Sequence, residues 1–381
     1  MKDLSESRVL IVDDVKANVD VLVQALRDDH KLSVALDGET ALRSVEKSPP
    51  DLILLDIVMP GIDGYEVCRQ LRASPKTQEI PVMFLSSLDE VKNKTQGFEV
   101  GGNDYLTKPF EVLEVKARVR SLLKAKAYSD AVKEKIAAEL AVARDIQLGI
   151  LPSQANITAS VAGSGLEVCA LLEPAREVGG DLYEVLRLPD GRLLVAIGDV
   201  SGKGIPAALF MAVTTTLVRT MARQYARPEE ILLQVNDALV AQNPRGMFVT
   251  MACMIVDPAT GTVGCANAGH PPAVLLRAGA APRLVLESTA MVAGVMSGIE
   301  IGCETLQLEP GDVLVVYTDG VTEAFNAGGT MFEEAGLLKC LHGAGASAGE
   351  AVSVLVEAVR GHAAGFPQSD DLTVAAVRRG R

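Results

Sequence analysis

The sequence has no tryptophan, only four histidines and six cysteines, and no pair of cysteines separated by two residues. Scattered cysteines of this kind indicate reduced core thiols, and they argue against a disulfide framework or a zinc site. No run of 18 or more apolar residues is present, so we expect no membrane-spanning helix. The polar start of the chain lacks the apolar segment of a signal peptide. We therefore expect a cytoplasmic protein.

An excess of basic charge is also missing. Lys and Arg number 36 against 49 Asp and Glu, which gives a formal net charge of −13. An acidic chain is a poor ligand for nucleic acid or for an anionic membrane surface, so neither partner is expected. Apolar residues are abundant, at 48% against 22% charged. The 381 residues are enough for two or three folded domains.

The first third of the chain alternates short apolar runs with amphipathic stretches. Strands are expected at residues 8–12, 32–36, 52–55, 82–85 and 104–107. Helical spacing is found at residues 16–28, 38–47, 63–72 and 89–99, and again from Phe110 through Leu123. Repeated strand–helix units predict a doubly wound, parallel α/β sheet.

Residues 122–150 contain neither Gly nor Pro before Gly149. Their apolar positions are Leu122, Ala125, Val132, Ile136, Leu140, Ala143, Ile146 and Ile150. A mean spacing of about 3.5 residues is typical of a two-stranded coiled coil, which predicts a homodimer. The alternative is one helix that packs on its own domain. Leu151-Pro152 is expected to end the helix.

The remaining residues predict an α+β domain with antiparallel sheets. Strand-like runs lie at residues 166–172, 192–199, 248–257, 262–266, 272–276, 313–318 and 373–377, and helices at 206–223, 228–241 and 349–363. The chain is therefore expected to hold a domain at residues 1–124, a helical linker at 125–151 and a second domain at 152–381.

Polar residues follow the predicted parallel strands. Asp13 and Asp14 follow the first strand, Asp56 the third, and Ser86 and Lys108 the last two. Ligands of open parallel sheets bind at the carboxyl ends of the strands. Three carboxylates at that edge call for a hard cation such as Mg²⁺. With the cation and a lysine to offset charge, one carboxylate can accept a phosphoryl group.

Residues 8–126 resemble the two-component receiver domains of the chemotaxis type. The residues that carry the resemblance are Asp13, Asp14, the segment LLDIVMPGIDG around Asp56, Ser86, Tyr105 and Lys108-Pro109-Phe110. The resemblance implies that a sensor histidine kinase phosphorylates Asp56 and that the three acids hold Mg²⁺. It also implies that Ser86, Tyr105 and Lys108 respond to the phosphate.

Four aspartates border apolar strands in the second half: Asp181, Asp199, Asp319 and Asp370, the last beside Asp371. Glycines next to the first three let backbone approach a ligand closely. Carboxylates without a His or Cys cluster favour Mg²⁺ or Mn²⁺ over zinc. Two such ions about 4 Å apart lower the pKa of a shared water, which suits attack on a phosphoester.

Residues 145–378 resemble bacterial metal-dependent serine/threonine phosphatases of the SpoIIE and RsbU type. The segments AREVGGD, GDVSGKGIPAALFMA, FVTMACMIVDPATG, ANAGHPP, LEPGDVLVVYTDGVTEA and SDDLTV occur in that family's order. The resemblance implies a two-layer β-sandwich flanked by helices. It also implies two Mn²⁺ or Mg²⁺ ions bridged by Asp181 and Asp199, with the Val200 carbonyl, Asp319 and Asp370 as further ligands.

Two other residues of this half are open to more than one interpretation. Arg176 is a candidate for holding the substrate phosphate, because a guanidinium suits that anion; structural pairing with Glu177 or Asp181 is the alternative. His270, which precedes two prolines in a turn, is interpreted as structural rather than as a general acid. The segment at 292–296, VAGVM, departs from the family's Gly-Leu-Pro-Leu-Gly-like pattern, which leaves the target open.

Together the two resemblances imply a response regulator that dephosphorylates phosphoserine or phosphothreonine on a partner protein. In this branch the usual partner is a STAS-type anti-sigma-factor antagonist. The alternative is a catalytically silent adaptor that binds a sigma-pathway protein. Such adaptors lose the metal-binding acids, whereas this chain has aspartate at all four positions, which favours an enzyme.

Overall fold

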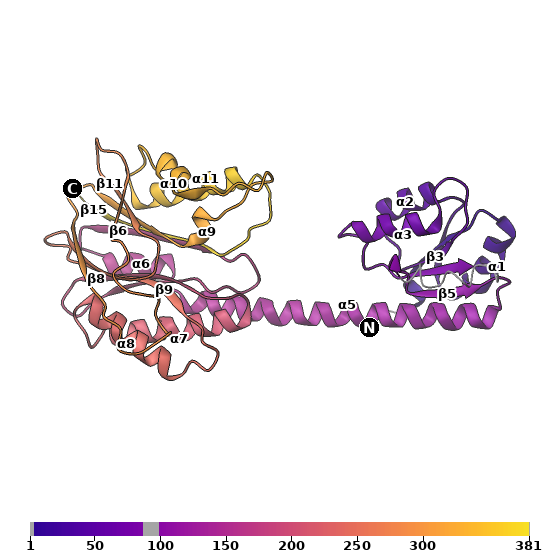
Figure 1. The fold of residues 1–381 in the computed structure, drawn as a ribbon, viewed down its shortest axis with the longest axis horizontal. Helices are drawn as coiled ribbons and strands as arrows, with labels where there is room; N and C mark the ends of the chain where they lie inside the picture. Colours follow the sequence, from indigo (N-terminus) through magenta and orange to yellow (C-terminus); the bar gives the residue numbers. More distant parts are fainter. Residues whose placement is uncertain (1–3, 87–98, 381) are drawn as a thin grey trace. The chain divides into compact units, whose positions relative to one another are not determined.

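The computed structural model describes residues 4–86 and 99–380, and it divides into two compact units, Met1–Ala138 and Glu139–Arg381 (Figure 1). The division falls within one long helix. The helix expected at 89–99 falls almost entirely outside the described residues. The domain limits expected from the sequence remain predictions.

The first unit contains a five-stranded parallel sheet with the order β2-β1-β3-β4-β5. Its strands are β1 (Arg8–Val12), β2 (Lys31–Ala35), β3 (Leu52–Asp56), β4 (Val82–Ser86) and β5 (Asp104–Thr107). Every residue of β3 and β4 is buried. Continuous apolar runs of this kind are expected where helices cover both faces of a parallel sheet.

Helices cover the receiver sheet on both faces, which confirms the doubly wound arrangement. The helices α2 (Gly38–Lys47) and α3 (Gly64–Ala73) pack on one face through residues such as Val45 and Leu71. The opposite face packs against α1 (Lys16–Leu26) and the start of α5, through residues such as Leu22 and Val119. Asp37 and Asp63 cap α2 and α3, since each side chain accepts a hydrogen bond from a first-turn amide.

A single helix of 39 residues, α5 (Val112–Ile150), continues from the receiver into the second unit. The helix ends at Ile150, directly before Leu151-Pro152, as predicted from the sequence. Residues 131–139 are exposed throughout, and Ile136 is 51% exposed. This stretch therefore does not pack on its own domain, and the coiled-coil partner remains a prediction. None of the described helices is long and apolar enough to cross a bilayer.

The second unit contains two five-stranded sheets, β13-β10-β9-β8-β7 and β12-β11-β14-β15-β6, in which all pairings are antiparallel. The strands are β6 (Leu166–Glu173), β7 (Leu182–Arg187), β8 (Leu193–Val200), β9 (Val249–Val256), β10 (Thr262–Ala268), β11 (Ala273–Leu276), β12 (Arg283–Val285), β13 (Glu304–Gln307), β14 (Val313–Tyr317) and β15 (Leu372–Arg379).

Helices flank both sheets of the second unit, as Figure 1 shows. The helices are α6 (Gln154–Val161), α7 (Ile205–Met221), α8 (Pro228–Ala241), α9 (Asp319–Thr322), α10 (Glu333–Cys340) and α11 (Ala348–Ala363). Met211 of α7 and Val235 of α8 join the core that includes the first sheet. Leu337 of α10 and Leu355 of α11 join the core on the second sheet. The expected helix-flanked sandwich is confirmed.

The sequence reading missed three strands and three helices of the second unit: β7, β12, β13, α6, α9 and α10. The strands β12 and β13 are short and lie at sheet edges. Polar residues are tolerated at an edge, so no continuous apolar run marks these strands in the sequence. The helices α9, of four residues, and α10, of eight, are too short to establish a clear period.

Candidate functional site

The receiver brings its three predicted acids together. One carboxylate oxygen from each of Asp13, Asp14 and Asp56 lies within 4.8 Å of the others. Asp13 and Asp56 are buried, and Asp14 is exposed. A β-carbon on Gly64 would lie 2.1 Å from the carbonyl oxygen of Asp56. The glycine therefore lets the chain after Asp56 fold back closely onto the strand end.

Lys108 lies within the same pocket. Its Nζ is 2.7 Å from Oδ2 of Asp56 and 2.9 Å from Oδ2 of Asp13. Asn18 donates its amide to the Asp13 carboxylate at 3.1 Å, which fixes the orientation of that carboxylate. Burial raises the pKa of Asp56 to about 6, and the hydrogen bond from Lys108 opposes that shift. Crowded oxygen ligands with one cationic neighbour fit a hard divalent cation.

The two other receiver residues lie beside this pocket. The Ser86 hydroxyl is buried, and within the described part of the chain it has no hydrogen-bond partner. A buried hydroxyl without a partner at this strand end is suited to donate a hydrogen bond to a phosphoryl oxygen. Tyr105 is buried, with its ring centroid 5.5 Å from that of Phe84, and burial raises its pKa to about 12. The roles of Ser86 and Tyr105 in switching remain predictions.

The four phosphatase acids come from both sheets of the second unit. Asp181 precedes β7, Asp199 lies in β8, Asp319 begins α9 after β14, and Asp370 precedes Asp371 and β15. Burial and the charges of Asp319 and Asp370 raise the pKa of Asp199 to about 7. Burial and the charge of Asp199 hold the pKa of Asp181 well above its ordinary range. Carboxylates that repel one another in this way are stabilised by divalent cations.

These four acids are spaced more widely than the receiver acids. Within residues 4–86 and 99–380, carboxylates converge in threes within 4.8 Å only in the receiver. Val200, the other predicted ligand, is buried at the end of β8. A β-carbon on Gly180 would lie 2.8 Å from the Val200 carbonyl oxygen.

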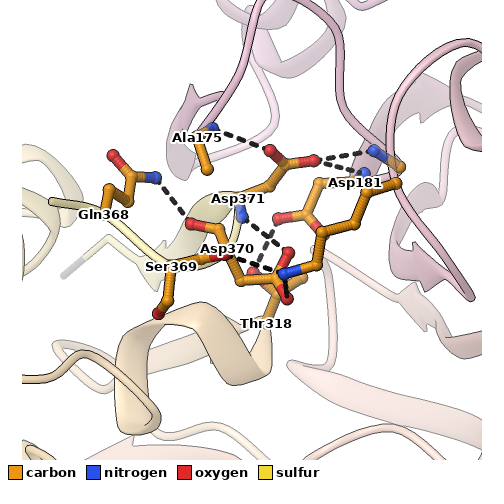
Figure 2. Close-up of polar contacts among 9 residues, drawn as sticks. Ala175, Asp181, Thr318, Gln368, Ser369, Asp370 and Asp371 are labelled. Atoms are coloured by element: carbon orange, nitrogen blue, oxygen red, sulfur yellow. Dashed lines mark hydrogen bonds and ion pairs between the residues drawn. The ribbon is translucent and has the colours of Figure 1, made fainter. Parts of the chain in front are cut away.

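Two threonines hold the Asp181 carboxylate in place. The hydroxyls of Thr318 and Thr373 donate to Oδ2 of Asp181, at 2.7 and 2.5 Å, and the Thr373 amide donates to the Thr318 hydroxyl at 3.0 Å. Asp181 is 2% exposed, and both threonines are fully buried. The bonds occupy one carboxylate oxygen from the side of the second sheet (Figure 2).

Asp370 and Asp371 make different contacts. The Asp371 carboxylate accepts hydrogen bonds from the amides of Ala175 at 2.8 Å and Gly180 at 2.7 Å (Figure 2). A β-carbon on Gly179 would lie 1.9 Å from Oδ2 of Asp371, so only glycine fits there. The Asp371 carboxylate is therefore occupied by hydrogen bonds from backbone amides. Asp370 is the better candidate for a metal ligand.

A cation that the sequence reading missed accompanies Asp370. Lys203 places Nζ 2.8 Å from Oδ2 of Asp370 and donates to the carbonyl of Ser369 at 2.7 Å. It lines a small cavity together with Arg176. Arg176 is exposed, and among the described residues it makes no ion pair. The flanking Gly202 and Gly204, both with positive φ, were the available signal, since glycine adopts this backbone conformation readily.

A second residue that the sequence reading missed connects α5 to the active-site loop. The buried Gln147 side chain donates to the carbonyl of Gly179 at 2.5 Å and accepts from the Gly179 amide at 3.1 Å. Gly179 is two residues from Asp181. The linker helix therefore holds the backbone that presents one of the predicted ligands.

His270 is buried, and its Nδ1 is 3.0 Å from the Thr250 hydroxyl. Burial lowers its pKa to about 3. A neutral, enclosed imidazole is a poor general acid at neutral pH. These features support the structural interpretation.

Two family models match the chain. The model for Stage II sporulation protein E (SpoIIE) matches residues 189–380. The model for the response regulator receiver domain matches residues 9–120. The two matches lie in the second and the first unit described above.

Two of the similar proteins each match part of this chain. The response regulator PleD of Caulobacter vibrioides is 43% identical over 130 residues, which is 34% of this chain and 29% of PleD. Protein IcfG of Synechocystis is 30% identical over 241 residues, which is 56% of this chain and 38% of IcfG. The chain therefore spans less than half the length of either relative.

Solved structures share the fold of the second unit. The SiaA-PP2C domain of Pseudomonas aeruginosa aligns with a TM-score of 0.57 and 22% identity over 65% of this chain and 98% of that one. The PP2C phosphatase domain of SpoIIE from Bacillus subtilis, with a fragment of its regulatory domain, aligns with a TM-score of 0.50 and 21% identity over 56% of this chain and 63% of that one. The chain belongs to the SpoIIE family of metal-dependent protein serine/threonine phosphatases and carries a response regulator receiver domain.

Proposed function

We propose that this chain is a response regulator that removes phosphate from phosphoserine or phosphothreonine of a partner protein. The observation that carries the proposal is the gathering of Asp181, Asp199, Asp319 and Asp370 from both sheets. Burial, together with the negative charges of Asp319 and Asp370, raises the pKa of Asp199 to about 7. Such a group is stabilised by two Mn²⁺ or Mg²⁺ ions, which would supply an activated water for attack on phosphorus.

The protein's own residues would position these ligands before substrate arrives. Thr318 and Thr373 fix the Asp181 carboxylate, and Asp371 fixes the loop that precedes it. Hydrogen-bonded partners of this kind orient metal ligands and tune their affinity. Because the Asp371 carboxylate accepts hydrogen bonds from backbone amides, we assign the role of metal ligand to Asp370 and not to Asp371.

The substrate phosphate would meet two cations. Arg176 and Lys203 line one cavity beside Asp370. A guanidinium fork binds phosphate oxygens in pairs, and an ammonium adds a mobile point charge. Arg176 is exposed and makes no ion pair among the described residues, whereas Lys203 would have to share its ammonium between the phosphate and Asp370.

We propose that phosphorylation of Asp56 by a sensor histidine kinase controls this activity. A phosphoryl group on Asp56 would engage Lys108, which already lies 2.7 Å from that carboxylate. It would also engage the Ser86 hydroxyl, which has no hydrogen-bond partner among the described residues. Mg²⁺ held by Asp13, Asp14 and Asp56 would offset its charge. The structural change caused by phosphorylation would reach the loop that precedes Asp181 through α5. Gln147 of that helix forms hydrogen bonds with both the amide and the carbonyl of Gly179 in this loop.

The proposed partner is a phosphorylated STAS-type anti-sigma-factor antagonist, and the proposed assembly is a homodimer along α5. The partner rests on the family resemblance. The dimer rests on the apolar positions of α5, which leave large side chains such as Ile136 and Ile146 exposed, at 51% and 63%.

The test is Mn²⁺-dependent hydrolysis of a phosphoserine protein and of a small aryl phosphate. Wild type is compared with Asp199→Asn and Asp56→Asn, each with and without beryllofluoride as the phosphoryl mimic. We expect no turnover by the Asp199 variant, and a response to beryllofluoride that Asp56→Asn abolishes. Failure of the wild type to hydrolyse either substrate, with Mn²⁺ bound, would favour an adaptor that binds a sigma-pathway protein.

A further inference from the structure

A cavity of about 290 Å³ lies directly beside the proposed metal ligands. Its lining includes Gly320, which follows Asp319, and Ser369, which precedes Asp370. Figure 2 shows Gln368 and Ser369 next to Asp370. The cavity therefore adjoins the segments that carry two of the proposed ligands.

The cavity walls are largely apolar. Phe325, Val359, Phe366, Pro367 and Leu372 contribute to them. Val359 and Leu372 are 3% exposed and belong to the core of the second sheet and its helices, so this part of the wall is fixed. Phe366 is 44% exposed. A large aromatic ring left open to solvent at the edge of a cavity gains contact area when an apolar group enters.

The polar groups of the cavity are already engaged. The Arg360 guanidinium is paired with the Glu173 carboxylate. The Gln368 amide donates to the carbonyls of Glu173 at 2.9 Å and Asp370 at 2.7 Å. These contacts tie α11 and the loop that carries both Phe366 and Asp370 to the end of β6. They also leave an occupant little to gain from charge, which favours an apolar one.

We propose that this cavity receives a large apolar side chain of the phosphoprotein substrate, close in sequence to the phosphorylated serine or threonine. The proposal rests on the proposed function and extends it to the substrate class. The chain would then select phosphorylation sites with a nearby Leu, Ile, Met or Phe. Burial of one such side chain in a matched pocket discriminates by roughly 10- to 200-fold against a truncated one.

The test uses phosphoserine peptides in which one position at a time, on either side of the phosphoserine, is Leu or Ala. With wild type, Mn²⁺ and beryllofluoride, we expect one position at which Ala raises KM about tenfold and leaves kcat nearly unchanged. Phe366→Ala should remove that preference. Hydrolysis of a small aryl phosphate, which does not reach the cavity, should be the same for the variant and wild type.

Two further variants guard against misinterpretation. Ala363→Phe, which fills the cavity from its wall, should also abolish the preference. Val213→Ala removes an apolar side chain that is 49% exposed on α7 and should retain it. The proposal is overturned if no position discriminates Leu from Ala, or if the preference survives in both cavity variants. If wild type hydrolyses neither the phosphoserine peptides nor the aryl phosphate, the proposed function itself is refuted.

Discussion

Asp371 accepts hydrogen bonds from the amides of Ala175 and Gly180, whereas its neighbour Asp370 faces Lys203. Removing the first carboxylate leaves buried amide groups without acceptors. Each such loss costs about 1–3 kcal/mol. Removing the second breaks a half-exposed ion pair, which contributes under about 1 kcal/mol. The same chemical group therefore serves stability at one position and ligand binding at the next.

We predict opposite outcomes for the two single variants. Asp370→Asn should weaken Mn²⁺ binding at least about tenfold with almost no change in thermal stability. Asp371→Ala should lower the free energy of unfolding by about 2 kcal/mol. Titration calorimetry with Mn²⁺ and urea unfolding of the full chain measure the two effects. Metal binding lost only in the Asp371 variant would show that the ligand assignment is wrong.

The enclosed imidazole of His270 gives a pH prediction. Its pKa is lowered to about 3 by burial, so the native state stays unprotonated while the unfolded chain binds a proton below about pH 6.5. The stability that this difference contributes is present above about pH 6.5. It is lost on acidification, by about 1.4 kcal/mol per pH unit, until the native pKa is reached.

We therefore expect one of the four histidine ring resonances to stay unshifted between about pH 5 and pH 8. That signal should be absent from His270→Gln. The acid dependence of unfolding should be shallower in the variant than in wild type. A His270 signal that titrates in this range would refute the enclosed, neutral state.

At the scale of elements, Gln147 of α5 matters because it holds a loop and not because it contributes to a core. It accepts from the amide of Gly179 and donates to its carbonyl, as a neighbouring strand would. Any rotation or shift of α5 would move or release this loop. The loop carries Asp181 two residues later, so helix position and metal affinity are linked.

We predict that Gln147→Ala lowers Mn²⁺ affinity and brings the ratio of activities with and without beryllofluoride close to one. The reason is that the Gly179 backbone groups lose their partners while the catalytic acids remain. Gln154→Ala is the matched control, because Gln154 also donates to a backbone carbonyl, that of Val168 at 3.2 Å. An unchanged ratio in Gln147→Ala would exclude this route for the signal.

Sequence periodicity predicted the elements whose burial is uniform. The strands β3 and β4 are apolar at nearly every position and lie in the centre of the receiver sheet. The strand β13, with residues that are mostly exposed at a sheet edge, has no such pattern. Its position is set by pairing with β10. Pairing partners distant in the chain cannot be identified from local spacing.

The same limit applies to the site. The acids were predictable because each borders an apolar strand, and glycine adjoins three of them. The groups that hold the acids were not, because their partners are remote: Thr373 and Asp181 lie 192 positions apart. Gln147 and Gly179 are separated by 32 positions. Only the folded chain brings such pairs within hydrogen-bonding distance.

At the scale of the whole molecule, regulation requires that a phosphoryl group on Asp56 alter a site in another unit. Within residues 4–86 and 99–380, α5 is the one helix or strand that the two units share. Its exposed apolar side chains are the reason why we propose that α5 pairs with the same helix of a second copy. Coupling between distant sites typically amounts to about 1–3 kcal/mol, which a change in how two helices pair can supply.

We predict that the double variant Ile136→Asp, Leu140→Asp is monomeric and does not respond to beryllofluoride, while its basal turnover is retained. Facing carboxylates would repel each other along the seam, yet these positions lie outside both cores. The matched control is Ala137→Asp, Ala141→Asp, which adds the same charges at the same spacing to exposed positions of α5 that are not on the seam. Sedimentation velocity and the phosphatase assay report the two properties. A double seam variant that remains dimeric and regulated would rule out the seam, and signal transfer would then have to occur within one chain, through Gln147.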